Sequence, residues 1–229
     1  VVFPTYREHA VALTLGLPYR QLLALFRGSD AGDWEHLDRF RNYQIIIGSQ
    51  ALHAVGYAMG LQLDGLVGNA EGGNAAAIAY HGDGASSQGD VNEAYVFAAS
   101  HNAPVVFFCQ NNQWAISEPA AVQSRIPLFQ RARGFGFPGI RVDGNDILSV
   151  HAVTSWALER AHRGDGPALV EAFTYRMGAH TTSDDPTKYR ASEETAAWAG
   201  RDPLSRLTTY LRRQGVNDDA WSAALDERA

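Results

Sequence analysis

Short apolar runs alternate with longer segments of helical periodicity along much of the chain. The runs at 75–80, 105–110 and 169–175 have polar or Gly-rich flanks and contain many β-forming residues, which predicts strands buried on both faces. Between them, 90–100 and 147–162 have the spacing of helices. Strands separated by helices of this length pair in parallel. The pattern therefore predicts an α/β fold with a parallel sheet flanked by helices.

Further helices and loops are expected outside this alternation. Three more helices are predicted to begin near Pro18, Gly48 and Pro203. Two polar stretches, 65–74 and 180–190, are expected to be loops, and the second is long enough to be functional.

Composition and charge restrict the class of partner. The chain has 229 residues with 19 Lys+Arg against 25 Asp+Glu, a net charge of −6, which argues against binding to nucleic acid or an anionic membrane. No apolar run approaches the roughly 18 residues of a membrane helix. The single cysteine, Cys109, excludes an intrachain disulfide and a CxxC zinc site, and a reducing cytoplasm is the expected location.

The two ends of the sequence lie within patterned segments. The chain opens at Val1 rather than Met, and its last residues, 217–229, have a helical pattern without a cap. We expect residues 1–229 to form a single domain that is truncated at both ends relative to a longer protein.

Polar residues follow two neighbouring predicted strands. Gly82-Asp83-Gly84 comes after the strand expected to end at Tyr80, and Asn111-Asn112 comes after the strand expected to end at Gln110. Both groups would lie at carboxyl ends of strands, where open α/β sheets bind ligands. Asp and Asn oxygens suit Mg²⁺ or Ca²⁺, and the glycines allow a phosphate to approach the backbone. The spacing therefore indicates a metal-bridged diphosphate.

Other phosphate and nucleophile motifs are missing. No GxGxxG or G-K-[ST] follows a strand, which leaves a nicotinamide dinucleotide fold and a P-loop unsupported. The stretch 84–89 misses the G-x-S-x-G pattern by one residue, which disfavours a serine hydrolase.

Purely structural roles remain open for several single residues. Arg7 could cap a helix, His180 could be a solvated loop histidine, and His81 and Cys109 could be structural core residues.

The stretch from His81 to Pro119 resembles the thiamine-diphosphate motif in the α subunit of 2-oxo acid dehydrogenases. The stretches 4–13, 48–60, 140–150 and 171–190 match that family in the same order. The resemblance implies a thiamine-diphosphate-binding α/β fold over nearly the whole chain. The segments FFCQNNQ and TSDD with a following YR are most similar to branched-chain 2-oxo acid members and related bacterial pyruvate enzymes.

The resemblance also implies site residues. Asp83 and Asn112 would bind Mg²⁺ through their side chains, and Trp114 through its backbone carbonyl. The remaining cofactor-binding residues would be Tyr6, Arg7, Ile47, Gly82, Gly84, Ala85 and His180, where Ile47 faces the aminopyrimidine through its backbone. Ser49 and Gln50 resemble a turn that binds K⁺ in some members. Three positions depart from patterns seen in some members, namely Gln110 in place of Arg, Ala179 in place of His and Thr181 in place of Ser.

The implied activity needs a second chain. The resemblance implies oxidative decarboxylation of a small branched-chain 2-oxo acid, with His180 as the catalytic residue of this chain and its loop shaping lipoyl access. A β subunit would supply the carboxylate that activates the aminopyrimidine, which gives an α₂β₂ heterotetramer that transfers the acyl group to a lipoyl acyltransferase. A pyruvate dehydrogenase α subunit is the nearest alternative. A non-catalytic module that binds metal and diphosphate is an alternative from another class.

Overall fold

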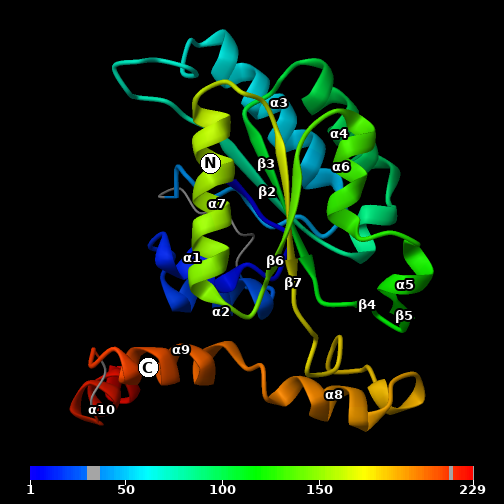
Figure 1. Ribbon diagram of the computed structural model, residues 1–229, viewed down its shortest axis with the longest axis vertical. Helices are drawn as coiled ribbons and strands as arrows, with labels where there is room; N and C mark the ends of the chain where they lie inside the picture. The colour runs from blue at the N-terminus through cyan, green and yellow to red at the C-terminus, as the bar shows by residue number, and fades with distance from the viewer. Residues whose placement is uncertain (30–36, 217–218, 229) are drawn as a thin grey trace.

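The centre of the molecule is a parallel five-stranded sheet with the order β1-β2-β3-β7-β6 (Figure 1). This computed structural model describes residues 1–29, 37–216 and 219–228. The strands are β1 (Val2–Phe3), β2 (Ala77–Gly82), β3 (Val105–Asn111), β6 (Gly139–Asp143) and β7 (Ala168–Phe173). The predicted α/β class with a parallel sheet is confirmed.

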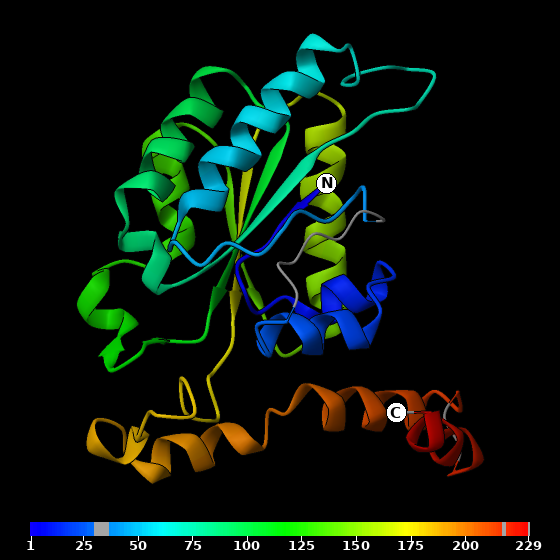
Figure 2. The same cartoon turned by 180° about the vertical axis from the view of Figure 1, so that it is seen from behind.

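Helices cover both faces of this sheet (Figures 1 and 2). One face carries α3 (Ser49–Leu63), α4 (Gly89–Ser100) and α6 (Arg131–Phe135), and the other carries α7 (Ile147–His162). Phe107 of β3 packs among the residues of the first layer, whereas its neighbours Val106 and Phe108 pack with those of the second. Burial on both faces explains why the strand sequences are continuously apolar.

The remaining helices lie around the carboxyl ends of the strands. The N-terminal pair α1 (His9–Thr14) and α2 (Tyr19–Phe26) has its own small core with Phe40. The C-terminal helices α8 (Ser192–Ala199), α9 (Pro203–Arg213) and α10 (Asp219–Arg228) follow one another below the sheet (Figure 2). None of the described helices is long and apolar enough for a membrane span.

Short elements connect the sheet to the site. A 3₁₀ turn (Gly84–Ser87) lies between β2 and α4, and further 3₁₀ turns are formed by Leu128–Gln130 and Pro186–Lys188. A hairpin of β4 (Trp114–Ala115) and β5 (Glu118–Pro119) follows β3 and leads into the short helix α5 (Ala120–Gln123).

The predicted strand bounds needed correction. Strand β3 ends at Asn111 rather than Gln110, and β7 covers Ala168–Phe173 rather than 169–175. The strand expected at 75–80 extends over Ala77–Gly82, because His81 is buried and pairs with Cys109 while Gly82 pairs with Gln110. The turn with Asp83 therefore begins two residues later than expected. Strand β6 was not predicted, since its charged residues hide the apolar pattern. The helix expected over 217–229 is observed as α10, and residues 217, 218 and 229 lie outside the described part.

A buried carboxylate joins the ends of three strands. Glu171 of β7 is fully buried, and its Oε1 accepts hydrogen bonds from Asn111 Nδ2 of β3 at 2.6 Å and Arg141 Nη2 of β6 at 2.7 Å. Its Oε2 accepts the backbone N–H of Phe129 at 2.9 Å. A buried carboxyl group is tolerated in a fold when hydrogen bonds satisfy its oxygen atoms. Because Asn111 supplies one of these hydrogen bonds, the network fixes its position at the end of β3.

A second buried carboxylate closes the turn before α1. Glu8 Oε2 accepts hydrogen bonds from Thr5 N at 2.6 Å and from Thr5 Oγ1 at 2.8 Å. This arrangement resembles a capping box, in which a Glu three residues after Thr reaches back to its backbone. Burial raises the pKa of Glu8, an effect that the Thr5 hydrogen bonds partly oppose. The closed turn fixes the backbone that carries Tyr6 and Arg7.

We predict that Glu171→Ala lowers the free energy of unfolding by about 2–5 kcal/mol, since it leaves the donors of Asn111 and Phe129 unpaired and removes the ion pair with the partly exposed Arg141. Urea denaturation would measure it. The control is Arg163→Ala, which breaks the exposed pair with Asp165 at 2.9 Å and should cost under about 1 kcal/mol. Equal effects of the two substitutions would contradict the structural importance of the Glu171 network.

The Glu8 carboxyl predicts a pH dependence of stability. Its raised pKa means that the folded chain keeps a proton that the unfolded chain has already released, so stability should fall as pH rises from the ordinary Glu value through the folded value. Glu8→Gln cannot titrate and should flatten this part of the profile. Denaturation curves at about pH 4 and about pH 7 would test it, with the exposed Glu93→Gln as control. Parallel profiles for wild type and Glu8→Gln would refute the prediction.

Candidate functional site

A cavity of about 500 Å³ lies at the carboxyl ends of β2 and β3. Its walls come from segments that are far apart in the sequence: the turn before α1, the residues leading into α3, the two strand ends, and the segment after β7. These segments bring together all the site residues expected from the sequence, which are Tyr6, Arg7, Ile47, Gly82, Asp83, Gly84, Ala85, Asn112, Trp114 and His180.

Asp83 is the most unusual residue of this cavity. Its side chain is only 2% exposed, and Oδ2 is buried without a hydrogen-bond partner. Burial raises the pKa of Asp83, although the Asn112 backbone, the Gln123 side chain and the positive Arg176 oppose this. A buried carboxylate oxygen without a partner is unfavourable unless a ligand completes it. The orphaned oxygen is what a cation site requires.

The other oxygens of the cavity fit a hard cation. Asn112 lines the same cavity, and its Oδ1 accepts the backbone N–H of Trp114 at 3.1 Å. Carboxylate and amide oxygens are the ligands that Mg²⁺ takes in proteins. Among the described residues there is no group of three or more His, Cys, Asp or Glu that could hold a metal. The donor set therefore suits a cation that takes its remaining ligands from elsewhere, such as phosphate and water.

The third expected ligand already has a partner. The Trp114 carbonyl accepts a hydrogen bond from Arg176 Nη1 at 3.2 Å. Arg176 also donates to the Ile116 carbonyl at 2.9 Å and to the Tyr189 hydroxyl at 2.6 Å. Sequence analysis missed Arg176, although it follows the end of β7 as Asp83 follows the end of β2. Its position beyond a strand end was the available signal.

Positive charge gathers at one side of the cavity. Arg7 Nη2 donates to the His180 carbonyl at 2.9 Å, and the Arg7 guanidinium lies 5.3 Å from the centre of the Tyr6 ring. Burial lowers the pKa of His180, and the charges of Arg7 and Arg176 lower it further. Two guanidinium groups beside a histidine favour an anionic ligand.

The turn that carries Asp83 packs tightly against the β4–β5 hairpin at Gly84 but not at Gly82. A Cβ atom on Gly84 would lie 2.8 Å from the Cβ of Ala115, so no side chain fits there. A Cβ on Gly82 would meet nothing within 4 Å. Glycine at 84 therefore lets the hairpin pack directly on the turn.

The potassium turn that the resemblance implies has one open acceptor. Gln50 is 1% exposed and its Nε2 donates to the Tyr80 carbonyl at 2.8 Å, while its Oε1 is buried without a partner. Ser49 Oγ instead donates to the Ile46 carbonyl at 2.9 Å. Gln50 therefore offers a buried, unpaired acceptor oxygen, whereas the Ser49 hydroxyl uses its proton on the Ile46 carbonyl.

The loop after His180 is more ordered by hydrogen bonds than its polar composition suggests. Asp184 Oδ2 accepts the backbone N–H of His180 at 2.7 Å and the Tyr189 hydroxyl at 2.6 Å. Arg190 is 9% exposed and donates to the carbonyls of Met177 and Gly178. Polar contacts therefore replace the apolar burial that this segment lacks.

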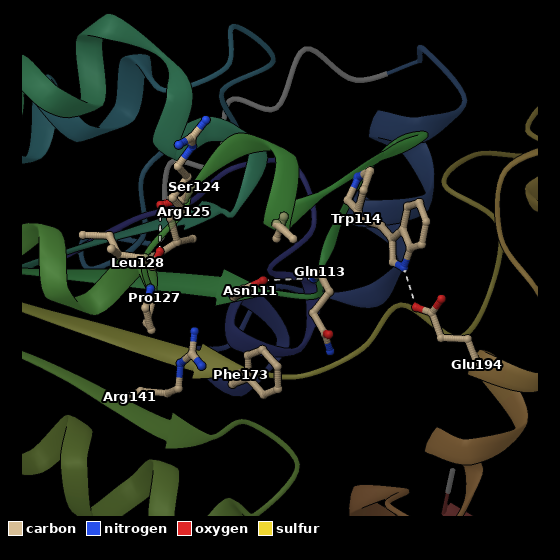
Figure 3. Close-up of a pocket in the computed structure, with 14 residues that line it drawn as sticks. Asn111, Gln113, Trp114, Ser124, Arg125, Pro127, Leu128, Arg141, Phe173 and Glu194 are labelled. Carbon is tan, nitrogen blue, oxygen red and sulfur yellow. Dashed lines mark hydrogen bonds between the residues drawn. The ribbon is translucent and has the colours of Figure 1, made fainter.

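A second cavity of about 350 Å³ is also lined by Trp114 (Figure 3). Arg141 and Phe173 lie side by side in it, with the guanidinium 4.5 Å from the ring centre. Trp114 lines both cavities, and its Nε1 donates to Glu194 Oε1 at 3.0 Å. Since no other expected site residue lines this cavity, it is separate from the candidate site.

Comparison with known proteins gives one consistent family. Residues 1–229 match the family described as "Dehydrogenase E1 component". The chain is 46% identical over 230 residues to the 3-methyl-2-oxobutanoate dehydrogenase subunit alpha of Mycobacterium tuberculosis, covering 99% of this chain and 59% of the relative. It is 41% identical over 232 residues to the pyruvate dehydrogenase E1 component subunit alpha of Staphylococcus aureus, covering 100% of this chain and 60% of the relative.

The chain thus spans about three fifths of the length of these curated relatives. The match extends across the strands, the hairpin and the loop that line the first cavity. The chain therefore belongs to the dehydrogenase E1 component family.

Proposed function

We propose that this chain is the α subunit of a thiamine-diphosphate-dependent 2-oxo acid dehydrogenase that acts on a branched-chain 2-oxo acid. Family membership implies thiamine diphosphate as the cofactor. The observation that carries the proposal is the buried, unpartnered Oδ2 of Asp83 in a cavity shared with Asn112 and Arg7. Residues 1–229 act in this proposal as a single cofactor-binding domain.

The residues of the cavity fit the cofactor. Asp83 and Asn112 would hold Mg²⁺ through their side chains, and Trp114 would contribute its carbonyl. Arg7, Tyr6 and His180 contact the diphosphate, and the backbone from Gly82 to Ala85 lies beside it. The backbone of Ile47 faces the aminopyrimidine. Gln50, with Ser49, is the proposed K⁺ site, for which its unpaired Oε1 is the supporting observation.

The chain's own residues bind and orient rather than perform the chemistry. When bound, thiamine diphosphate supplies a thiazolium ring that takes up the electrons released as a 2-oxo acid loses carbon dioxide. Arg7 and the segment around His180 close the diphosphate end, which reduces access of water to the site. In this sense His180 is the catalytic residue proposed for this chain, and its loop shapes the approach of a lipoyl group.

A partner chain completes the proposed site. Ile47 lines the cavity and follows Ile45 and Ile46 in the chain. The three side chains are 72% (Ile45), 71% (Ile46) and 45% (Ile47) exposed, and a contiguous exposed apolar segment is typical of an interaction surface. We propose that a β subunit covers it, forms an α₂β₂ heterotetramer and supplies the carboxylate for the aminopyrimidine. A lipoyl acyltransferase then accepts the acyl group. The proposed location is the cytoplasm, where the buried thiol of Cys109 stays reduced.

Pyruvate is the second candidate substrate. The M. tuberculosis relative is named for 3-methyl-2-oxobutanoate, and the S. aureus relative is named for pyruvate. The higher identity to the former supports a branched-chain substrate. A difference of a few methylene groups is worth only about 1–3 kcal/mol in a pocket, so kinetic comparison of the two acids decides between them.

We predict that Asp83→Ala weakens the joint binding of Mg²⁺ and thiamine diphosphate by well over tenfold, on the order of 2–4 kcal/mol, because the metal loses a charged ligand. Calorimetric titration would measure this. The exposed Glu93→Ala on α4 is the matched control and should bind as the wild type does. Near-wild-type affinity in Asp83→Ala would remove the metal assignment.

The purified chain alone should release no carbon dioxide from a 2-oxo acid, since this site lacks the partner's carboxylate and half of its water-excluding walls. Addition of the β subunit should restore activity, with a higher kcat/KM for 3-methyl-2-oxobutanoate than for pyruvate. The reverse ratio would favour the pyruvate alternative. Cofactor binding without activity in the assembled protein would favour a non-catalytic module, and steady turnover by the chain alone would rule out the partner dependence.

A further inference from the structure

The short helix α5 lies directly against the turn that carries Asp83. A Cβ on Gly84 would lie 2.8 Å from Ala115 of the preceding hairpin and 3.9 Å from Gln123 Oε1. Gln123 is the last residue of α5. The hairpin and helix therefore pack on the turn without space between them, and the Gln123 side chain reaches the Asp83 region.

The side-chain amide of Gln123 has a hydrogen-bond partner at its oxygen atom and none at its nitrogen atom. Ser87 Oγ donates to Gln123 Oε1 at 3.2 Å. Gln123 Nε2 is buried and has no hydrogen-bond partner.

Two unpaired polar groups of opposite character lie in this region. Gln123 Nε2, a donor, and Asp83 Oδ2, an acceptor, are both buried without a hydrogen-bond partner. Burial raises the pKa of Asp83, and the Gln123 side chain is among the groups that oppose this, as expected from a donor beside a carboxylate. Because buried polar atoms without partners are rare and unfavourable, packing alone does not account for this pair.

We propose that Gln123 is a positioning residue that orients the Asp83 carboxylate for a divalent cation. This inference rests on the proposed function. In the proposed site the Asp83 carboxylate binds the cation, and Gln123 Nε2–H, whose amide is oriented by Ser87, donates to the same carboxylate. Residues that orient a metal ligand in this way commonly have a large effect on metal affinity.

The test is titration of the full chain, assembled with its β subunit, with Mg²⁺ at saturating thiamine diphosphate. Gln123→Ala should raise the half-saturating Mg²⁺ concentration about tenfold, while thiamine diphosphate affinity at saturating Mg²⁺ stays near the wild-type value. Val122→Ala, from the same helix at a side chain that is 70% exposed, is the matched control and should change neither quantity. Thermal unfolding without ligands separates a loss of packing from a loss of metal affinity.

Each result decides the proposal. A Mg²⁺ requirement for Gln123→Ala equal to that of Val122→Ala overturns it, and weak binding by Asp83→Ala in the same series shows that the proposed function still stands. Unchanged binding by Asp83→Ala overturns both. If Gln123→Ala does not fold, the exposed Ser87→Ala replaces it, since loss of the orienting hydroxyl should raise the Mg²⁺ requirement in the same direction by a smaller factor.

Discussion

The buried Glu171 carboxylate is the constraint on which the geometry of the site depends. It holds Asn111 at the end of β3 and Arg141 on β6. Asn111 Oδ1 in turn accepts the backbone N–H of Gln113 at 3.0 Å, which shapes the chain just after the strand. Asn112 lies within this turn, so a charge buried between the strands determines where a candidate metal ligand lies.

Two other carboxyl groups, at the edges of the cavity, also hold the chain in place through hydrogen bonds. Glu8 closes the turn that contains Arg7, and Asp184 closes the loop after His180. Among the described residues, the buried carboxyl groups of Glu8 and Glu171 accept hydrogen bonds from the chain's own donors. Asp83 differs because one of its oxygens is buried without any partner. A cation bound at the proposed site would complete this carboxylate and stabilise the protein.

Much of the fold and the site could be predicted because their signals are local. The strand-helix alternation identified β2, β3 and β7, and polar residues at the strand ends identified Asp83 and Asn112. The family resemblance added Tyr6, Arg7 and His180, which line the same cavity. Strand β6 was missed because its Arg141 and Asp143 interrupt the apolar pattern. Arg176 and Gln123 were missed because their importance comes from contacts with residues far away in the sequence.

Arg176 also explains how the site tolerates a departure from the pattern of some relatives. Gln110 stands where some family members have an arginine, and it lines the cavity without contributing a charge. Arg176 brings a guanidinium to the same cavity from the neighbouring strand end. Burial raises the pKa of Asp83, and the charge of Arg176 is among the effects that oppose this. In the proposed site a diphosphate would carry more negative charge than one Mg²⁺ neutralises, and Arg7 and Arg176 would provide the balance. The charge of the site thus depends on the cavity as a whole rather than on one motif position.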